Sequence, residues 1–214
     1  MKRILFPLAA LALLSSASAQ VNTKGALQFG IGLDLGVHAT HFENELTFAG
    51  LTKKDSNRDG AVTVTVPIEA QLGLADRFSL GLYIEPGSYL DSAGTHPNKL
   101  FLAGLSPRYY AVNKDRFALY FHADLGFGTL KIGDVQNGAK RYDDRYAGGH
   151  FRLGLATQWY FGDAFGINLG LKYAATSFKW KDRDPSDPVL GTVGYSAKLK
   201  TSGIQFQVGL QVKI

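Results

Sequence analysis

The last eleven residues of the chain alternate strictly between apolar and polar side chains. The apolar positions are Ile204, Phe206, Val208, Leu210, Val212 and Ile214, and the positions between them are Gln205, Gln207, Gly209, Gln211 and Lys213. A period of two predicts a β-strand with one apolar and one polar face. The same rhythm recurs at roughly 27–37, 62–74, 78–89, 100–111, 117–130, 150–161 and 165–177. No segment has a helical period, so we expect an all-β chain of eight strands.

The connections between these strands alternate in length. Short turns fall at 75–77, 112–116 and 162–164, and longer polar segments fall at 39–60, 90–99, 131–149 and 178–199. This alternation predicts an antiparallel up-and-down meander that closes into a barrel. In a transmembrane barrel the short turns are periplasmic and the long loops are extracellular. An even number of strands returns both termini to the short-turn side.

The contents of the polar face indicate which face points outward. This face carries many glycines and tyrosines together with Asp34, Glu69, Glu85, Asp124, Arg108, Arg152, Lys172 and Lys213. A solvated outer surface usually has more lysine and glutamate and far less glycine, whereas charges enclosed in a lumen need partners of opposite sign. We therefore expect the apolar faces to meet lipid. The lumen should hold an ion-pair network of Asp34, Glu69, Glu85, Arg108, Asp124, Arg152 and Lys172. Eight strands leave an interior that side chains fill.

Strand length agrees with a membrane span. The strand from Leu27 to Val37 has ten rises of about 3.3 Å, which at a tilt of ~40° cover about 25 Å of the membrane normal. Aromatic residues gather beside the short turns: Phe78, Tyr109, Phe117, Trp159, Phe161 and Phe165. They predict an interfacial girdle at the periplasmic boundary. Packing of these rings in a core is the alternative explanation.

The N-terminus predicts export. Lys2 and Arg3 precede an apolar run, Ile4–Leu14, and Ala17–Ala19 has the small-x-small pattern of a signal-peptidase site. The run of about 11 residues is shorter than the ~20 that a spanning helix needs, although a retained anchor is the alternative. We expect cleavage after Ala19 and one mature domain, 20–214. The chain has no cysteine, and its net charge of +5 falls to about +3 without Lys2 and Arg3, too weak to indicate nucleic-acid binding.

These features together resemble a known family. The carrying segments are the signal peptide, Leu74–Gly87, Leu105–Gly128 and the alternating terminal run. The chain resembles the small outer-membrane β-barrel proteins, the group that contains the OmpA transmembrane domain, OmpX and porin-like barrel domains. The resemblance implies residence in the bacterial outer membrane, insertion by the barrel-assembly machinery, and no cofactor. Such chains usually end in an aromatic residue, whereas this one ends in Ile214, with Phe206 eight residues earlier. No peptidoglycan-binding domain follows the last strand, so a cell-wall tether is not expected.

The stretch DSNRDG is the main candidate metal site. Asp55, Asn57, Asp59 and Gly60 fall at positions 1, 3, 5 and 6 of an EF-hand loop. Position 12, which needs a bidentate glutamate, is Val66, and flanking helices are absent. A looser calcium loop through Asp55, Asn57 and Asp59 remains as an alternative. We favour a polar loop whose Asp-Gly supplies the turn into the next strand.

Two other groups of residues have the chemistry of a site. His38, His41, Glu43 and Glu45 cluster near the end of the first strand and contain metal ligands and a general base. His38 and Glu43 with Ser88 resemble the rim residues of a lipid-modifying barrel enzyme. The spacing favours neither arrangement. The chain contains no HExxH, P-loop or GxSxG motif, and its glycines do not match GxGxxG.

The expected function is therefore that of a non-enzymatic integral outer-membrane barrel. Its work would be envelope structure, binding of an extracellular partner through the loops 39–60, 131–149 and 178–199, or at most a narrow pore. A lipid-modifying barrel enzyme is one alternative. A soluble, lipocalin-like periplasmic barrel is another, and it would need the large apolar residues inside.

Overall fold

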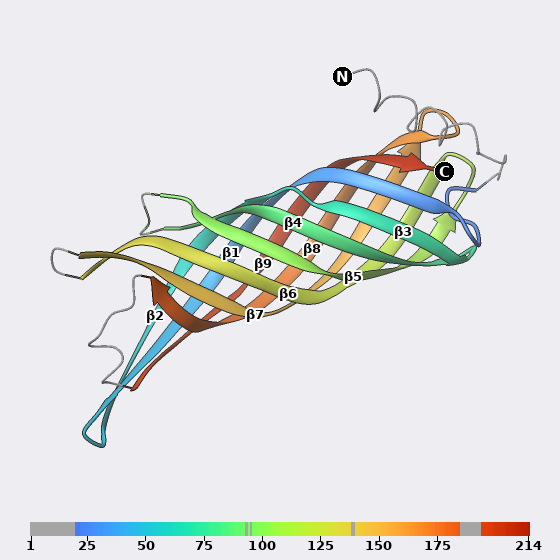
Figure 1. The fold of residues 1–214 in the computed structure, drawn as a ribbon. Coiled ribbons are helices and arrows are strands. Elements are labelled where there is room, and N and C mark those ends of the chain that lie inside the picture. The colour runs from blue at the N-terminus through green and yellow to red at the C-terminus, as the bar shows by residue number, and fades with distance from the viewer. Residues whose placement is uncertain (1–19, 93, 95, 138–139, 185–193) are drawn as a thin grey trace.

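The computed structural model describes residues 20–92, 94, 96–137, 140–184 and 194–214, and the predicted signal peptide lies outside the described residues. The described chain forms one antiparallel sheet of the strands β1 (Leu27–Phe48), β2 (Leu51–Thr65), β3 (Ile68–Ala75), β4 (Phe78–Asp91), β5 (Asn98–Asn113), β6 (Phe117–Asn137), β7 (Lys140–Tyr160), β8 (Phe165–Asp184) and β9 (Gly194–Lys213). The first strand pairs with the last, β1 with β9, and closes the sheet into an elongated barrel (Figure 1). None of the described residues belongs to a helix long and apolar enough to cross a membrane.

Two of these strands, β2 and β3, share one position in the barrel. Both pair with β1 on one side and with β4 on the other. The break falls at Val66 and Pro67, because proline has no backbone N–H to donate to the ladder. Hydrogen bonds continue across the break, since Val66 N donates to Pro86 O (2.8 Å) and Gly32 N donates to Pro67 O (2.9 Å). The barrel thus has eight strand positions, and the predicted eight-stranded up-and-down topology is confirmed.

The connections at one end are short, as predicted. The turns 76–77, 114–116 and 161–164 lie there, together with the C-terminus (Figure 1). Ile214 N donates to Leu27 O (2.8 Å), which ties the end of the chain to the start of β1. This is the periplasmic end of the predicted topology.

The connections at the other end differ from the prediction. The segment 39–60, expected as a loop, is a continuous β-ribbon in which β1 runs to Phe48 and β2 begins at Leu51. Ala49 (φ 48°) and Gly50 (φ 80°) form a two-residue turn with positive φ at both positions, as a type I′ hairpin requires. This ribbon extends farthest from the periplasmic end (Figure 1). Its alternating pattern escaped the sequence analysis because both of its faces carry polar residues.

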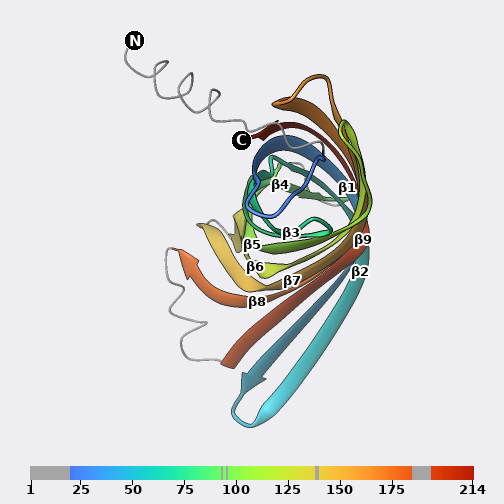
Figure 2. The same cartoon turned by 90° about the vertical axis from the view of Figure 1, so that its right-hand side faces the viewer.

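Two other predicted loops, 131–149 and 178–199, also contain long stretches of strand, whereas the predicted loop 90–99 is confirmed, since β4 ends at Asp91 and β5 begins at Asn98. β6 continues to Asn137 and β7 begins at Lys140, so most of 131–149 is paired backbone. β8 likewise continues to Asp184, and β9 begins at Gly194 within the predicted loop 178–199. Figure 2 shows these strands flaring outward beyond the closed part of the barrel. The extracellular part is therefore built of ribbons that extend the barrel wall.

The outer wall of the barrel is apolar. Large side chains with exposed fractions above one third point outward from every strand position, among them Val37 (70%), Leu82 (64%) and Leu210 (63%). A closed sheet with apolar residues outside and polar residues inside has the lipid-facing arrangement of a membrane barrel. The lipocalin-like alternative is wrong, because it requires the opposite arrangement.

The polarity of the two faces inverts along the strands. In β9 the outward side chains change from Ile204 to Lys200, while the inward ones change from Gln205 to Leu199. Beyond this point the interior is a buried apolar cluster that contains Leu100, Leu102, Leu130, Tyr146, Phe178 and Leu199. Because lipid favours an apolar exterior and water a polar one, the inversion marks the extracellular edge of the membrane-spanning zone.

Candidate functional site

Arg152 on β7 is the centre of a buried ion-pair network in the lumen. Its Nη1 donates to Glu85 Oε2 on β4 (2.5 Å), and its Nε lies 3.0 Å from Asp124 Oδ2 on β6. The guanidinium also lies over the ring of Tyr83, 4.8 Å from the centroid. All four side chains are almost fully buried. The planar guanidinium thus joins a carboxylate on the neighbouring strand β6 to one on β4, two strands farther along the sheet.

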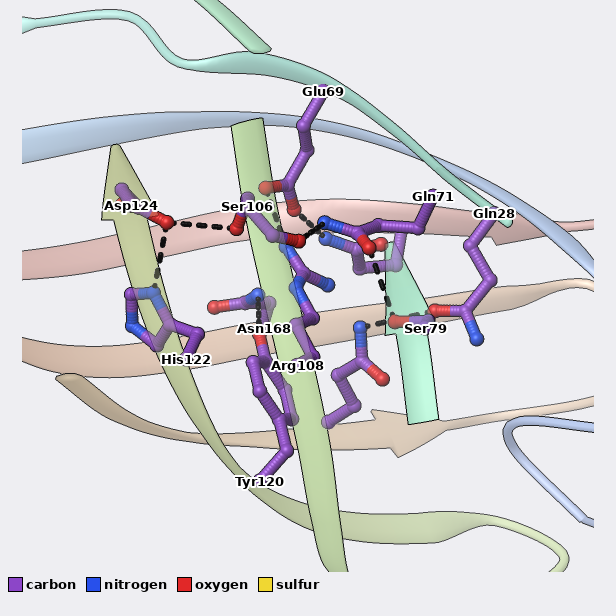
Figure 3. A network of polar contacts seen from close by, with 12 residues as sticks. Gln28, Glu69, Gln71, Ser79, Ser106, Arg108, Tyr120, His122, Asp124 and Asn168 are labelled. Atoms are coloured by element: carbon purple, nitrogen blue, oxygen red, sulfur yellow. Dashed lines mark hydrogen bonds and ion pairs between the residues drawn. The ribbon is translucent and has the colours of Figure 1, made fainter. Parts of the chain in front are cut away.

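Two further ion pairs flank this centre. Lys172 Nζ donates to Asp34 Oδ2 (2.5 Å), which connects β8 to β1. Arg108 on β5 donates to Glu69 on β3, as Figure 3 shows. Gln211 Nε2 also donates to Glu69 (2.7 Å). The structure thus brings all seven charged residues of the sequence-based network into one lumen, four carboxylates with three cations.

Neutral polar side chains complete the network, and the sequence analysis did not single them out. Ser106 Oγ donates to Asp124 Oδ1 (2.7 Å), and Thr65 Oγ1 donates to Glu85 Oε1 (2.5 Å). His122 Nδ1 lies 3.1 Å from the same Asp124 oxygen (Figure 3). These residues share the inward phase of the alternation with the charged residues, but they carry no formal charge that marks them in the sequence. Counting every polar residue of that phase would have found them.

Glycine makes room for the larger rings in the lumen. A Cβ atom at Gly154 would overlap the imidazole of His122, which faces it across β6 and β7. A Cβ atom at Gly36 would similarly overlap the imidazole of His38. The many inward glycines therefore let bulky polar residues cross a narrow interior.

Little free space is left among these side chains. The cavity in the network has a volume of about 10 Å³. Its lining includes Glu69, Tyr83, Arg108, Asp124, Arg152 and Lys172. That volume is at the lower limit for holding a single water molecule, so the middle of the barrel is filled by side chains.

A short N-terminal segment fills the periplasmic mouth. Val21 is fully buried among Tyr110, Tyr120 and Tyr160, and its N–H donates to Lys114 O (3.0 Å). The next residue, Asn22, is also fully buried. Its backbone N–H donates to Asn113 Oδ1 (3.0 Å), and its side-chain amide donates to the carbonyl oxygens of Ala75 (2.7 Å) and Asp76 (3.2 Å). These contacts attach the segment to two periplasmic turns.

Replacing Val21 with aspartate should release this segment. The new carboxylate would be buried among tyrosine rings in place of an apolar side chain, which is unfavourable. We expect trypsin to cleave after Lys24, an exposed residue, at least several-fold faster in Val21→Asp than in the wild type. Val21→Ala, which adds no charge, should stay close to wild type. Equal cleavage of all three proteins would show that the mouth does not hold the segment.

The predicted aromatic girdle lies on the outer wall beside the short turns. Phe161 and Phe165 are 72% and 65% exposed, and Trp159 and Tyr109 also point outward. Phe117 lies against Trp159 with the ring centroids 5.4 Å apart. With Phe78, also exposed, these rings line the periplasmic end of the apolar wall from β4 to β8. Their exposure argues against the alternative of packing in a core.

The candidate metal and enzyme clusters do not assemble. His38 points into the barrel, where its Nε2 lies 2.8 Å from Thr63 Oγ1, whereas His41, Glu43 and Glu45 point outward from the β1–β2 ribbon. Ser88 also points outward, so it cannot meet His38 through the wall. Within the described part of the chain, no three His, Asp or Glu side chains are placed to hold a metal ion.

The DSNRDG stretch is extended strand and not the polar loop that we expected. Asp55, Asn57 and Asp59 lie on one face of β2, two residues apart, and pair with residues of β1. A β-strand spaces such side chains by about 6–7 Å and does not wrap them around an ion. Asp59 instead accepts hydrogen bonds from Gly60 N (2.8 Å) and the hydroxyl of Ser92. The backbone therefore gives no support to the calcium alternative.

Comparison with solved structures identifies the fold. The chain matches the outer membrane protein OprG from Pseudomonas aeruginosa with a TM-score of 0.56 at 12% sequence identity, over 90% of this chain and 97% of OprG. The fold is that of the small outer-membrane β-barrels. The outer membrane protein AlkL, determined in lipid bilayers, matches with a TM-score of 0.54 at 15% identity, over 94% of this chain and 95% of AlkL. No family model and no curated protein matches the sequence.

Proposed function

We propose that this protein is a non-enzymatic integral outer-membrane barrel whose lumen is closed. The observation that carries the proposal is the buried bridge from Glu85 through Arg152 to Asp124. The free space left among the side chains around it is a cavity of about 10 Å³. The N-terminal segment lies buried at the periplasmic mouth, and a buried apolar cluster lies toward the opposite end of the interior. A lumen filled in three layers has no path for a hydrated solute.

A barrel with a closed lumen acts through its outer surface and its extracellular ribbons. The apolar wall contacts outer-membrane lipid, and the barrel-assembly machinery would insert the strands. The ribbons within 39–60, 131–149 and 178–199 carry exposed charges and extend beyond the membrane, where they can meet an extracellular partner. We therefore propose an envelope or surface-binding role.

Planar-bilayer recording tests the closed lumen. Because side chains fill the interior, the reconstituted protein should give no conductance steps, or only small and rare ones. A sixteen-stranded porin in the same bilayer provides the positive control, since its lumen is an aqueous channel. Large, steady, porin-like steps from this protein would contradict the proposal.

The absence of enzymatic activity needs a separate measurement. Lipid A extracted from cells with and without the protein should have the same mass spectrum, because His38, Glu43 and Ser88 do not converge on one face of the wall. A new lipid A species that depends on the protein would establish a lipid-modifying enzyme instead.

A further inference from the structure

A patch of cations lies on the outer wall just beyond the extracellular edge of the apolar zone. We call it the cationic patch, and it consists of Arg58, Lys179, Lys198 and Lys200, with His41 lying between Arg58 and Lys200, on four neighbouring strands. His41 pairs in register with Arg58 of β2 on one side and with Lys200 of β9 on the other. Lys179 of β8 pairs with Lys198 of β9. Since partners in register share a face, these side chains form two adjacent rows on the outside of the barrel.

The charges of the patch are largely uncompensated. Glu43 is the carboxylate within these rows, and it lies 2.8 Å from Lys200 Nζ and 2.9 Å from His41 Nε2. The hydrogen bond from Lys200 lowers the pKa of the Glu43 carboxyl, so Glu43 is ionised at neutral pH. Within the described residues, Arg58, Lys179 and Lys198 form no ion pair. An anion arriving at this face would meet three free cations.

A hollow in the wall lies beside the patch, on the side of the membrane. Its volume is about 780 Å³, and Arg58, His41 and Lys200 line its polar edge. Small outward residues form its floor: Ala39, Ala175 and Ser202. A second hollow of about 840 Å³ continues outward past Lys179 and Lys198.

The hollow is continuous with the lipid-facing wall. One step farther along the strands, Val37, Ile204 and Tyr173 are exposed apolar residues that lie side by side in register. The order along the wall is therefore apolar surface, shallow hollow, cations. A membrane lipid presents the same order in its acyl chains, its polar headgroup and its anionic groups.

We propose that the cationic patch binds a phosphate group of a phosphorylated glycolipid of the outer leaflet. The acyl chains would lie on the wall around Val37 and Ile204, and the sugar headgroup would occupy the hollow. Its phosphate would receive hydrogen bonds from Arg58, Lys198 and Lys200, because guanidinium and ammonium groups are strong donors to phosphate oxygens. A lipid fits better than a soluble anion, since only a lipid also covers the adjoining apolar wall. The inference rests on the membrane orientation of the proposed function but not on the closed lumen.

Native mass spectrometry of the detergent-solubilised protein tests the proposal. The probes are diphosphorylated lipid A and its monophosphorylated form, added at matched concentrations. We expect the diphosphorylated lipid to bind the wild type several-fold more tightly. The triple variant Arg58→Gln/Lys198→Gln/Lys200→Gln should lose about tenfold or more of that affinity, because each cation near an anionic headgroup contributes to binding.

A matched control removes three cations at the periplasmic end: Arg77→Gln/Lys114→Gln/Arg116→Gln. These residues are exposed in the short turns, so this variant has the same net charge as the first and should bind lipid A as the wild type does. Equal losses in both variants, or equal binding of the two lipids by the wild type, would overturn the proposal. Displacement of the lipid by millimolar inorganic phosphate would instead indicate a site for free anions and would also overturn it.

A second variant keeps the test decisive if the triple variant does not fold. Glu43→Gln removes the carboxylate that neutralises Lys200, so it should bind diphosphorylated lipid A more tightly, by several-fold. Glu45→Gln, which changes a carboxylate that pairs with Lys54 farther along the ribbon, is its control. Unchanged or weaker binding in Glu43→Gln would overturn the proposal. The bilayer recordings do not depend on this outcome, so the closed lumen and the lipid site fail separately.

Discussion

Replacing Arg152 with methionine should destabilise the barrel by about 3–5 kcal/mol. The substitution keeps much of the side-chain volume but leaves two buried carboxylates, Glu85 and Asp124, without their shared cation. An unpaired charge in an interior of this kind costs far more than the pair itself contributes. The measurement is the free energy of unfolding in urea, for protein folded into detergent micelles or lipid vesicles.

The matched control is the same substitution at an exposed arginine. Arg145 is about half exposed and pairs with Asp182 and Asp184 on the extracellular ribbons. Because solvent screens such pairs, Arg145→Met should cost about 1 kcal/mol or less. If the two variants had similar free energies of unfolding, the lumen network would not be the main polar support of the barrel.

Placing an arginine on the lipid-facing wall should have the second-largest effect. Leu33 lies at the middle of the apolar part of β1, between Leu27 and Val37, and points outward. Leu33→Arg should destabilise the barrel by about 2–4 kcal/mol, the cost of a cation near the bilayer midplane. Unfolding in urea from lipid vesicles measures it.

The tip of the β1–β2 ribbon supplies the control for that substitution. Leu51 is 79% exposed beyond the membrane zone, so Leu51→Arg makes the same chemical change in water and should leave the free energy of unfolding within about 0.5 kcal/mol of the wild type. If Leu33→Arg and Leu51→Arg lowered the free energy of unfolding by equal amounts, the wall around Leu33 would not face lipid, and β1 would not span the membrane.

The barrel was predictable because the alternation is strict where the two faces meet different media. In the terminal run, Phe206 and Leu210 alternate with Gln205 and Gln211, and the structure places these pairs on opposite faces of β9. The charged residues of the lumen were predictable for the same reason. Asp34 and the other charged residues of the network stand at the polar positions of strands whose alternate positions are apolar.

The ribbons and the apolar cluster were not predictable in this way. Beyond the membrane edge the apolar residues point inward and the polar ones outward, as Leu199 and Lys198 of β9 do. The alternating pattern of the membrane-spanning part therefore does not continue into the ribbons. Between Asp55 and Asp59 every side chain is polar, and the pairing comes from the backbone ladder alone. The plug formed by Val21 and Asn22 depends on contacts with residues more than 50 positions away, which no local pattern encodes.

The lumen contacts also constrain the order of events during assembly. Asp34 and Lys172 are 138 residues apart in sequence, and Gln28 and Gln158 are 130 apart. These contacts require the first and the later strands to be in place at the same time. A partial barrel would expose unpaired charges and open strand edges to lipid, both at high cost. We therefore expect no stable half-inserted species. Insertion into the membrane should be slow and cooperative. The pairing of β1 with β9 should form in the same step as the ion pairs of the lumen.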